Sequence, residues 1–186
     1  TVQNIPAHQF IILGLGSIGK RHAEFLSSYK GDLVCIDPNI EARHWVQDNY
    51  GLDKAIAYSS LHEAEESILL SPLKKIGVIS NWGTLHFQSI LDLKALKINK
   101  LFVEKPIAIN LEQLEQVKQA YKQQLILGKS ARLMVGFNRR FSPQIKKMKT
   151  LTFSFFIIYG FFLHNLFSIP LLIFILLYEK KNNNHC

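Results

Sequence analysis

A short apolar run that ends in three glycines constrains this chain more than any other segment. Residues 10–19 read FIILGLGSIG, and a helix-forming segment follows at once. In such a run Gly14 lets a strand turn sharply, Gly16 carries no Cβ that would keep a ligand away, and Gly19 lets the helix pack close to the strand. The N-terminus of the helix adds free N–H groups and the positive end of its dipole. The pattern therefore predicts a strand–loop–helix unit that binds the pyrophosphate of a dinucleotide.

A second element follows at the distance that such a site requires. Residues 33–36, LVCI, are typical of a short buried strand, and Asp37 stands at its carboxyl end, 23 residues after Gly14. An acidic residue about 20 positions after the glycines binds the 2′-hydroxyl of the adenosine ribose. The alternative is a plain strand–turn–helix without a ligand, and the spacing of Asp37 favours the dinucleotide.

Strand and helix patterns alternate along the first 137 residues. Ser60 with Glu63, and Asn110 with Gln113, fit capping boxes at the starts of helices over 61–69 and 111–124. A further helix is expected over 84–97. This alternation predicts an α/β fold with a doubly wound parallel sheet, a Rossmann dinucleotide-binding domain over residues 1–150. Short apolar segments rich in Val, Ile and Leu are the expected strands, covered on both faces: Phe10–Leu13, Leu33–Ile36, Ala55–Tyr58, Ile76–Ser80, Leu101–Glu104 and Leu133–Phe137.

Composition narrows the class of protein. The chain has 186 residues and a net charge of +8, and 48% of its residues are apolar. Its lysines are dispersed, so we interpret the basic balance as a solvated surface and expect no nucleic-acid partner. Two cysteines, Cys35 in a predicted strand and Cys186 at the end, form neither a disulfide framework nor a metal motif, so no metal is expected. We expect no signal peptide, and residues 1–150 are expected in the cytoplasm.

The alternation of strands and helices gives way to an apolar segment after residue 150. Residues 151–178 carry no charge, and Phe, Leu and Ile make up 19 of these 28 positions. The run exceeds the roughly 20 residues that a membrane-spanning helix needs, and a polar end over 179–186 follows it. Two interpretations stay open: a C-terminal membrane anchor, or an accidental tail such as out-of-frame or read-through translation of A/T-rich DNA. In either case a segment this apolar enters a bilayer or aggregates unless the domain covers it.

Three further motifs stand at the carboxyl ends of predicted strands. Residues 79–86 read ISNWGTLH, residues 100–106 read KLFVEKP, and residues 133–141 read LMVGFNRRF. In an open parallel sheet these ends meet at one crevice, where ligands bind. Together with the glycine loop, and in the same order and spacing, the motifs resemble those of the Gfo/Idh/MocA family of NAD(P)-dependent oxidoreductases over residues 8–150.

The resemblance implies a role for each residue that matches a family motif. A carboxylate at Asp37 repels a 2′-phosphate, which predicts NAD, while Arg43 nearby leaves NADP as the alternative. The implied cofactor-binding positions are Gly14, Gly16, Ser17, Ile18 and Gly19 around the pyrophosphate, Asp37 on the ribose, Asn81, Trp82 and His86 beside the nicotinamide, Glu104, Lys105 and Pro106 at the turn between nicotinamide and substrate, and Asn138 and Arg139 at the closure of the cleft.

Lys105 is the expected catalytic residue. The implied reaction is hydride transfer between NAD and a hydroxyl of a sugar-like molecule or polyol, and an ammonium beside it stabilises the alkoxide that develops as hydride leaves. The alternative for Lys105 is a surface lysine at a strand end. For His86 the alternative is capping or packing in the first turn of its helix, and His22 is interpreted as structural.

The sequence departs from the family where a second, α+β domain would begin. Family members carry most of the substrate site there and, commonly, an Asp and a His for acid–base chemistry, whereas this chain continues into the apolar segment. Lys105 would then act alone in an open cleft, where water weakens electrostatic stabilisation. We therefore expect a truncated domain that binds the dinucleotide with little or no turnover. The alternatives are a non-catalytic, membrane-tethered nucleotide-binding module and a gene remnant.

Overall fold

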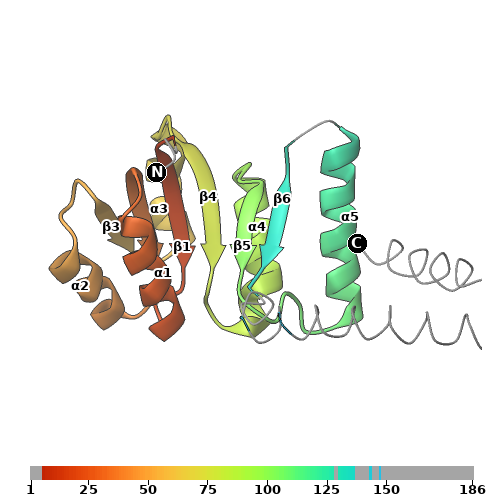
Figure 1. Cartoon of the computed structure of the whole chain (residues 1–186), viewed down its shortest axis with the longest axis horizontal. Helices are drawn as coiled ribbons and strands as arrows, with labels where there is room; N and C mark the ends of the chain where they lie inside the picture. Colours follow the sequence, from red (N-terminus) through yellow and green to blue (C-terminus); the bar gives the residue numbers. More distant parts are fainter. Residues whose placement is uncertain (1–5, 128–129, 137–142, 144–146, 148–186) are drawn as a thin grey trace, which may run out of the picture. The chain divides into compact units, whose positions relative to one another are not determined.

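One parallel sheet of six strands organises the part of the chain that the computed structural model describes, residues 6–127, 130–136, 143 and 147. The strands lie in the order β3-β2-β1-β4-β5-β6 (Figure 1). All six predicted strands are present, with ends shifted by no more than two residues, and the predicted doubly wound α/β fold is confirmed. The strands are β1 (His8–Leu13), β2 (Gly31–Ile36), β3 (Ala55–Tyr58), β4 (Lys74–Ile79), β5 (Lys100–Val103) and β6 (Arg132–Val135).

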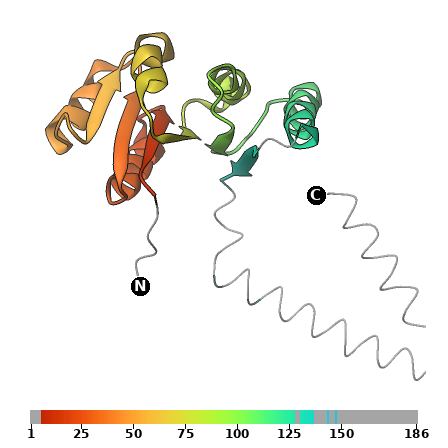
Figure 2. The ribbon, with the colours of Figure 1, turned by 90° about the horizontal axis from the view of Figure 1, so that it is seen from above.

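Helices cover the sheet on its two faces. Figure 2 shows α4 and α5 together on one side of it. The predicted helix over 84–97 begins as a 3-10 turn, η1 (Gly83–Leu85), which leads directly into α4. On one face lie α1 (Ser17–Ser27) and α2 (Ile40–Asn49), and on the other α3 (Leu61–Leu70), α4 (His86–Ala95) and α5 (Leu111–Ile126).

The central strands β1 and β2 are apolar over their last four residues because both of their faces are buried there. Phe10 and Ile12 of β1 belong to the core under α1 and α2, whereas Ile11 and Leu13 belong to the core under α3, α4 and α5. A strand covered on both sides has no solvent-facing positions, so its sequence shows no polar alternation. The thiol of Cys35 is fully buried in the first of these cores, and this burial raises its pKa to about 12.

Both predicted capping boxes are present, but the side chain of the third helical residue accepts its hydrogen bond from the residue before the N-cap. The Ser60 Oγ accepts a hydrogen bond from the backbone N–H of Glu63 at 3.3 Å, and Asn110 accepts one from Gln113 at 2.9 Å. In the standard box the longer side chain returns to the N-cap N–H. Here Glu63 accepts from the N–H of Ser59 instead, and Gln113 from that of Ile109, one residue earlier in each case. Both helix starts therefore keep their side-chain caps.

The register of the sheet aligns the carboxyl ends of its strands. Leu13 pairs with both Ile36 and Ile79, Ile79 pairs with Val103, and Val103 pairs with Val135. The residue that follows each of these therefore lies at one common edge, at the topological switch point between β1 and β4 and beside it. Ligands of open α/β sheets bind at this edge.

Contacts within the chain divide it into a unit over Thr1–Phe137, which contains the sheet, and a unit over Asn138–Cys186. The predicted domain end at residue 150 and the apolar segment 151–178 lie outside the described residues, so the membrane anchor stays a prediction from sequence. Within the described residues, no helix combines the length and the hydropathy needed to cross a membrane.

Two residues of α3 offer a matched test of the core. Ile68 is fully buried and Leu70 is 75% exposed. Ile68→Ala should lower the free energy of unfolding by about 2–5 kcal/mol, because it removes buried methyl groups and leaves a cavity. Leu70→Ala should change it by about 0.5 kcal/mol or less. Urea unfolding followed by circular dichroism measures both, and equal losses would contradict the assignment of Ile68 to the core.

Candidate functional site

The glycine loop between β1 and α1 is shaped by two close contacts. Gly14 has φ of +90°, and a Cβ at this position would lie 2.5 Å from the backbone N and Cα of Asn81. A Cβ on Gly19 would overlap the carbonyl oxygen of Gly14. Both glycines are therefore required by the packing of the protein itself, as the sequence predicts for a sharp turn and a close helix.

Gly16 differs from the other two glycines. Its φ of −63° is accessible to any residue, and a Cβ there would meet no atom of the described residues within 4 Å. Packing therefore gives no reason for a glycine at this position. The open space beside it is what the approach of a ligand to the backbone requires.

The N-terminus of α1 is free to bind an anion. Gly16 is its N-cap, no side chain in the described part of the chain caps the helix, and its first turn holds no acidic residue. The first helical bond runs from the N–H of Lys20 to the carbonyl of Gly16 at 2.9 Å. The N–H groups of Ser17, Ile18 and Gly19 thus have no acceptor within the helix, which with the helix dipole favours a phosphate.

Asp37 reaches from the end of β2 to the glycine loop. Its Oδ2 accepts a hydrogen bond from the N–H of Leu15 at 2.6 Å, and its Oδ1 accepts from the N–H of Asn39 at 2.9 Å. The Nη1 of Arg43 donates to the carbonyl oxygens of Asp37 and Pro38 at 2.9 and 2.8 Å. The carboxylate is therefore held beside the loop, and Arg43 bonds to the backbone of the same turn.

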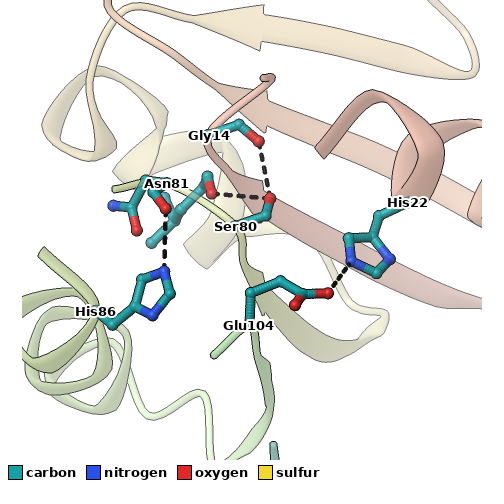
Figure 3. A network of polar contacts seen from close by, with 7 residues as sticks. Gly14, His22, Ser80, Asn81, His86 and Glu104 are labelled. Atoms are coloured by element: carbon teal, nitrogen blue, oxygen red, sulfur yellow. Dashed lines mark hydrogen bonds and ion pairs between the residues drawn. The ribbon is translucent and has the colours of Figure 1, made fainter. Parts of the chain in front are cut away.

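Ser80, at the end of β4, links the turn after β4 to the glycine loop. Its hydroxyl lies 2.9 Å from the carbonyl oxygen of Gly14 and 3.2 Å from that of Leu13 (Figure 3). Ser80 is not among the site residues predicted from the sequence. The available signal was its place, directly after an apolar strand and opposite Gly14 across the switch point.

The turn that follows Ser80 carries three of the predicted nicotinamide residues. The Asn81 amide donates to the hydroxyl of Ser89 at 2.9 Å, and the Trp82 side chain is 81% exposed. His86 is only 1% exposed, and its ring nitrogens face two backbone carbonyl oxygens, that of Pro106 at 2.6 Å and that of Asn81 at 3.0 Å. The ring of His86 therefore lies behind the edge, against its backbone.

The turn after β5 presents Lys105 at the same edge. Lys105 is exposed, and its peptide bond to Pro106 is cis. The Glu104 side chain points toward α1, where its Oε1 lies 3.0 Å from the Nε2 of His22 (Figure 3). His22, interpreted from the sequence as structural, thus contacts the motif that contains Lys105.

The predicted site residues fall into two groups. Asn138 and Arg139 lie outside the described residues. Within the described ranges, no group of three or more His, Cys, Asp or Glu side chains is arranged to hold a metal ion. The edge described above brings together the others except His86, which is buried behind it: Gly14, Gly16, Ser17, Ile18 and Gly19 after β1, Asp37 after β2, Asn81 and Trp82 after β4, and Glu104, Lys105 and Pro106 after β5.

Two curated proteins are similar in sequence to this chain. The myo-inositol 2-dehydrogenase of Thermotoga maritima is 27% identical over 141 residues, which are 74% of this chain and 38% of that protein. The uncharacterized oxidoreductase YrbE of Bacillus subtilis is 26% identical over 146 residues, with shares of 75% and 38%. The chain therefore spans well under half the length of these curated relatives.

Solved structures show the same fold. A probable dehydrogenase from Thermotoga maritima superposes with a TM-score of 0.62 at 24% identity, covering 78% of this chain and 41% of that one. The WlbA dehydrogenase from Thermus thermophilus, solved with NAD and UDP-GlcNAcA, superposes with a TM-score of 0.63 at 20% identity, covering 77% and 46%.

The match to a family model covers most of the described region. The model, described as an oxidoreductase family with an NAD-binding Rossmann fold, matches residues 8–137. The predicted family and the predicted dinucleotide cofactor are both confirmed by this match. The chain belongs to the Gfo/Idh/MocA oxidoreductase family, and residues 8–137 are its NAD-binding Rossmann domain.

Proposed function

We propose that this domain binds NAD across the carboxyl edge of the sheet, with Lys105 at the reacting end. The open position at Gly16 is the observation that carries the proposal, because it is the one glycine of the loop that the packing of the protein does not require. The uncapped first turn of α1 lies next to it and supplies N–H donors for the pyrophosphate.

The remaining cofactor contacts follow from the order of the strands. The Asp37 carboxylate, one strand away from the loop, receives the hydroxyls of the adenosine ribose and favours NAD over NADP by charge. Asn81 and Trp82, on the opposite side of β1, lie toward the nicotinamide, with His86 behind them. Asn138 and Arg139 are proposed from the sequence alone to close this side.

We further propose that the protein transfers hydride to or from a hydroxyl-bearing carbon of a sugar-like molecule or polyol. NAD, when bound, supplies the hydride acceptor. Lys105 would hydrogen-bond the reacting oxygen and stabilise its developing negative charge. The substrate class is supported by the names of the relatives, since one is a myo-inositol dehydrogenase and another was solved with a nucleotide sugar.

Binding and turnover are expected to separate in this chain. Lys105 is exposed at an open edge, where water competes with it for the substrate oxygen. Calorimetric titration of NAD into the full chain should show binding, whereas NADH absorbance with myo-inositol or UDP-sugars should show little or no turnover. Absence of NAD binding would overturn the proposed function, and fast turnover would overturn the expectation of low activity.

The Gly16→Ala variant tests the pyrophosphate site directly. The new methyl group meets no protein atom, so the free energy of unfolding should change by about 1 kcal/mol at most. It projects into the space proposed for the pyrophosphate, so NAD affinity should fall at least about tenfold, or roughly 1.4 kcal/mol. Gly14→Ala is the contrasting variant, because it should destabilise the fold itself. Unchanged NAD affinity in folded Gly16→Ala would place the pyrophosphate elsewhere.

The Asp37→Asn variant tests the preference for NAD. Replacing the carboxylate with a neutral amide removes the repulsion of a 2′-phosphate and weakens the hold on the ribose hydroxyls. The ratio of NADP to NAD affinity should therefore rise by about tenfold, measured by calorimetry with each dinucleotide. Asp48→Asn, at an exposed position of α2, is the matched control and should leave the ratio unchanged. An unchanged ratio in Asp37→Asn would contradict the assignment of this residue to the ribose.

A further inference from the structure

We propose that His22 and His86 are positioning residues that hold the two neighbours of Lys105 in the chain, Glu104 and Pro106. The inference rests on the proposed function of Lys105 and explains how a side chain on a short turn acquires a defined place. One histidine bonds to the residue before Lys105, and the other bonds to the residue after it.

Glu104 is held by His22 of α1, the helix that begins at the glycine loop. The Nε2 of His22 lies 3.0 Å from the Oε1 of Glu104, and the two side chains are 25% and 20% exposed. The His22 ring packs edge-on against Phe102 at 5.1 Å between centroids, which restricts its orientation. Gly136 packs against this carboxylate, since a Cβ at Gly136 would lie 2.9 Å from the Oε2 of Glu104. The carboxylate is thus enclosed between α1 and the end of β6.

Pro106 is held by His86, the first residue of α4. The Nδ1 of His86 lies 2.6 Å from the Pro106 carbonyl oxygen, and its Nε2 lies 3.0 Å from that of Asn81. Carbonyl oxygens only accept hydrogen bonds and a neutral imidazole carries one N–H, so the tautomer with its proton on Nδ1 donates to Pro106, at the shorter of the two distances. Gly83 adds a packing contact, since a Cβ there would lie 2.9 Å from the Cδ of Pro106. His86 therefore joins the turn after β4 to the turn after β5.

Together the two contacts place Lys105 relative to both ends of the dinucleotide site. His22 stands on the helix whose N-terminus is proposed to bind the pyrophosphate, and His86 stands behind the turn proposed to face the nicotinamide. The Lys105 side chain itself is exposed, so Lys105 is held through its neighbours, by the side chain of Glu104 and the carbonyl group of Pro106. A lysine has much rotamer freedom, and fixing its backbone reduces the number of positions its ammonium can reach.

Isosteric variants separate positioning from general packing. His22→Phe keeps the ring contact with Phe102 but removes the bond to Glu104, whereas His22→Gln restores a donor. At His86, Asn keeps a donor in the place of Nδ1, toward Pro106, while Gln keeps one in the place of Nε2, toward Asn81. His62→Phe is the matched control, because the His62 side chain is 95% exposed.

The first measurement needs no cofactor. In the full chain, kept in mild detergent, amide hydrogen exchange of the peptide around residues 104–109 should rise at least tenfold in His22→Phe and His86→Gln. Exchange in β1 and β2 should stay unchanged. His22→Gln, His86→Asn and His62→Phe should resemble the wild type. A rise throughout the sheet, or none around residues 104–109 in folded His22→Phe, would overturn the positioning role.

The second measurement uses NAD and an amine-reactive acylating reagent. In the wild type, saturating NAD should slow the acylation of Lys105 at least fivefold while leaving Lys118 unaffected, and His22→Phe should lose this protection. If NAD binds to the wild type without protecting Lys105, the proposed function of this lysine is overturned. If His22→Phe is protected like the wild type despite its changed exchange, the positioning inference is overturned instead.

Discussion

The close approach of the glycine loop to the turn after β4 is the contact on which the rest of the site depends. Gly14 lies against the backbone of Asn81, Gly19 lies against the carbonyl of Gly14, and the Ser80 hydroxyl bonds to that same carbonyl. These contacts bring the start of α1 and the end of β4 together at the switch point. A side chain at Gly14 or Gly19 would push the two apart, and with them the phosphate end and the nicotinamide end of the proposed site.

Much of the fold could be predicted from sequence because its signals are local. A buried parallel strand is a short run rich in Val, Ile and Leu, and a helix start is a polar cap with a Glu or Gln three residues on, so Leu33–Ile36 and the helix after Ser60 were recognised from their own residues. The glycine loop was recognised in the same way. Its three positions were assigned different purposes, and the structure likewise separates Gly14 and Gly19, which packing requires, from Gly16, which is open.

The contacts that join the motifs could not be predicted, because they pair residues far apart in sequence. His22 and Glu104 are 82 positions apart, and Ser80 and Gly14 are 66 apart. Only the strand order places them side by side. His86 illustrates the same difficulty, since its spacing from β4 indicates a residue at the edge but not that its ring is buried behind it. Sequence thus indicated which residues gather at the edge, and the topology was needed to show which of them touch.

Because the carboxyl ends of the strands are aligned, insertions and deletions have different effects at the two edges of the sheet. Adding or deleting one residue in β1, β4 or β5 would move the following group by about 3.3 Å along the sheet and turn its side chain to the opposite face. Gly14, Ser80 and Glu104 would then no longer stand opposite one another. Insertions at the opposite edge of the sheet, such as the connection from α3 to β4, carry no such penalty. The strands of this domain are therefore fixed in length by the site, while the loops at the far edge are free to vary.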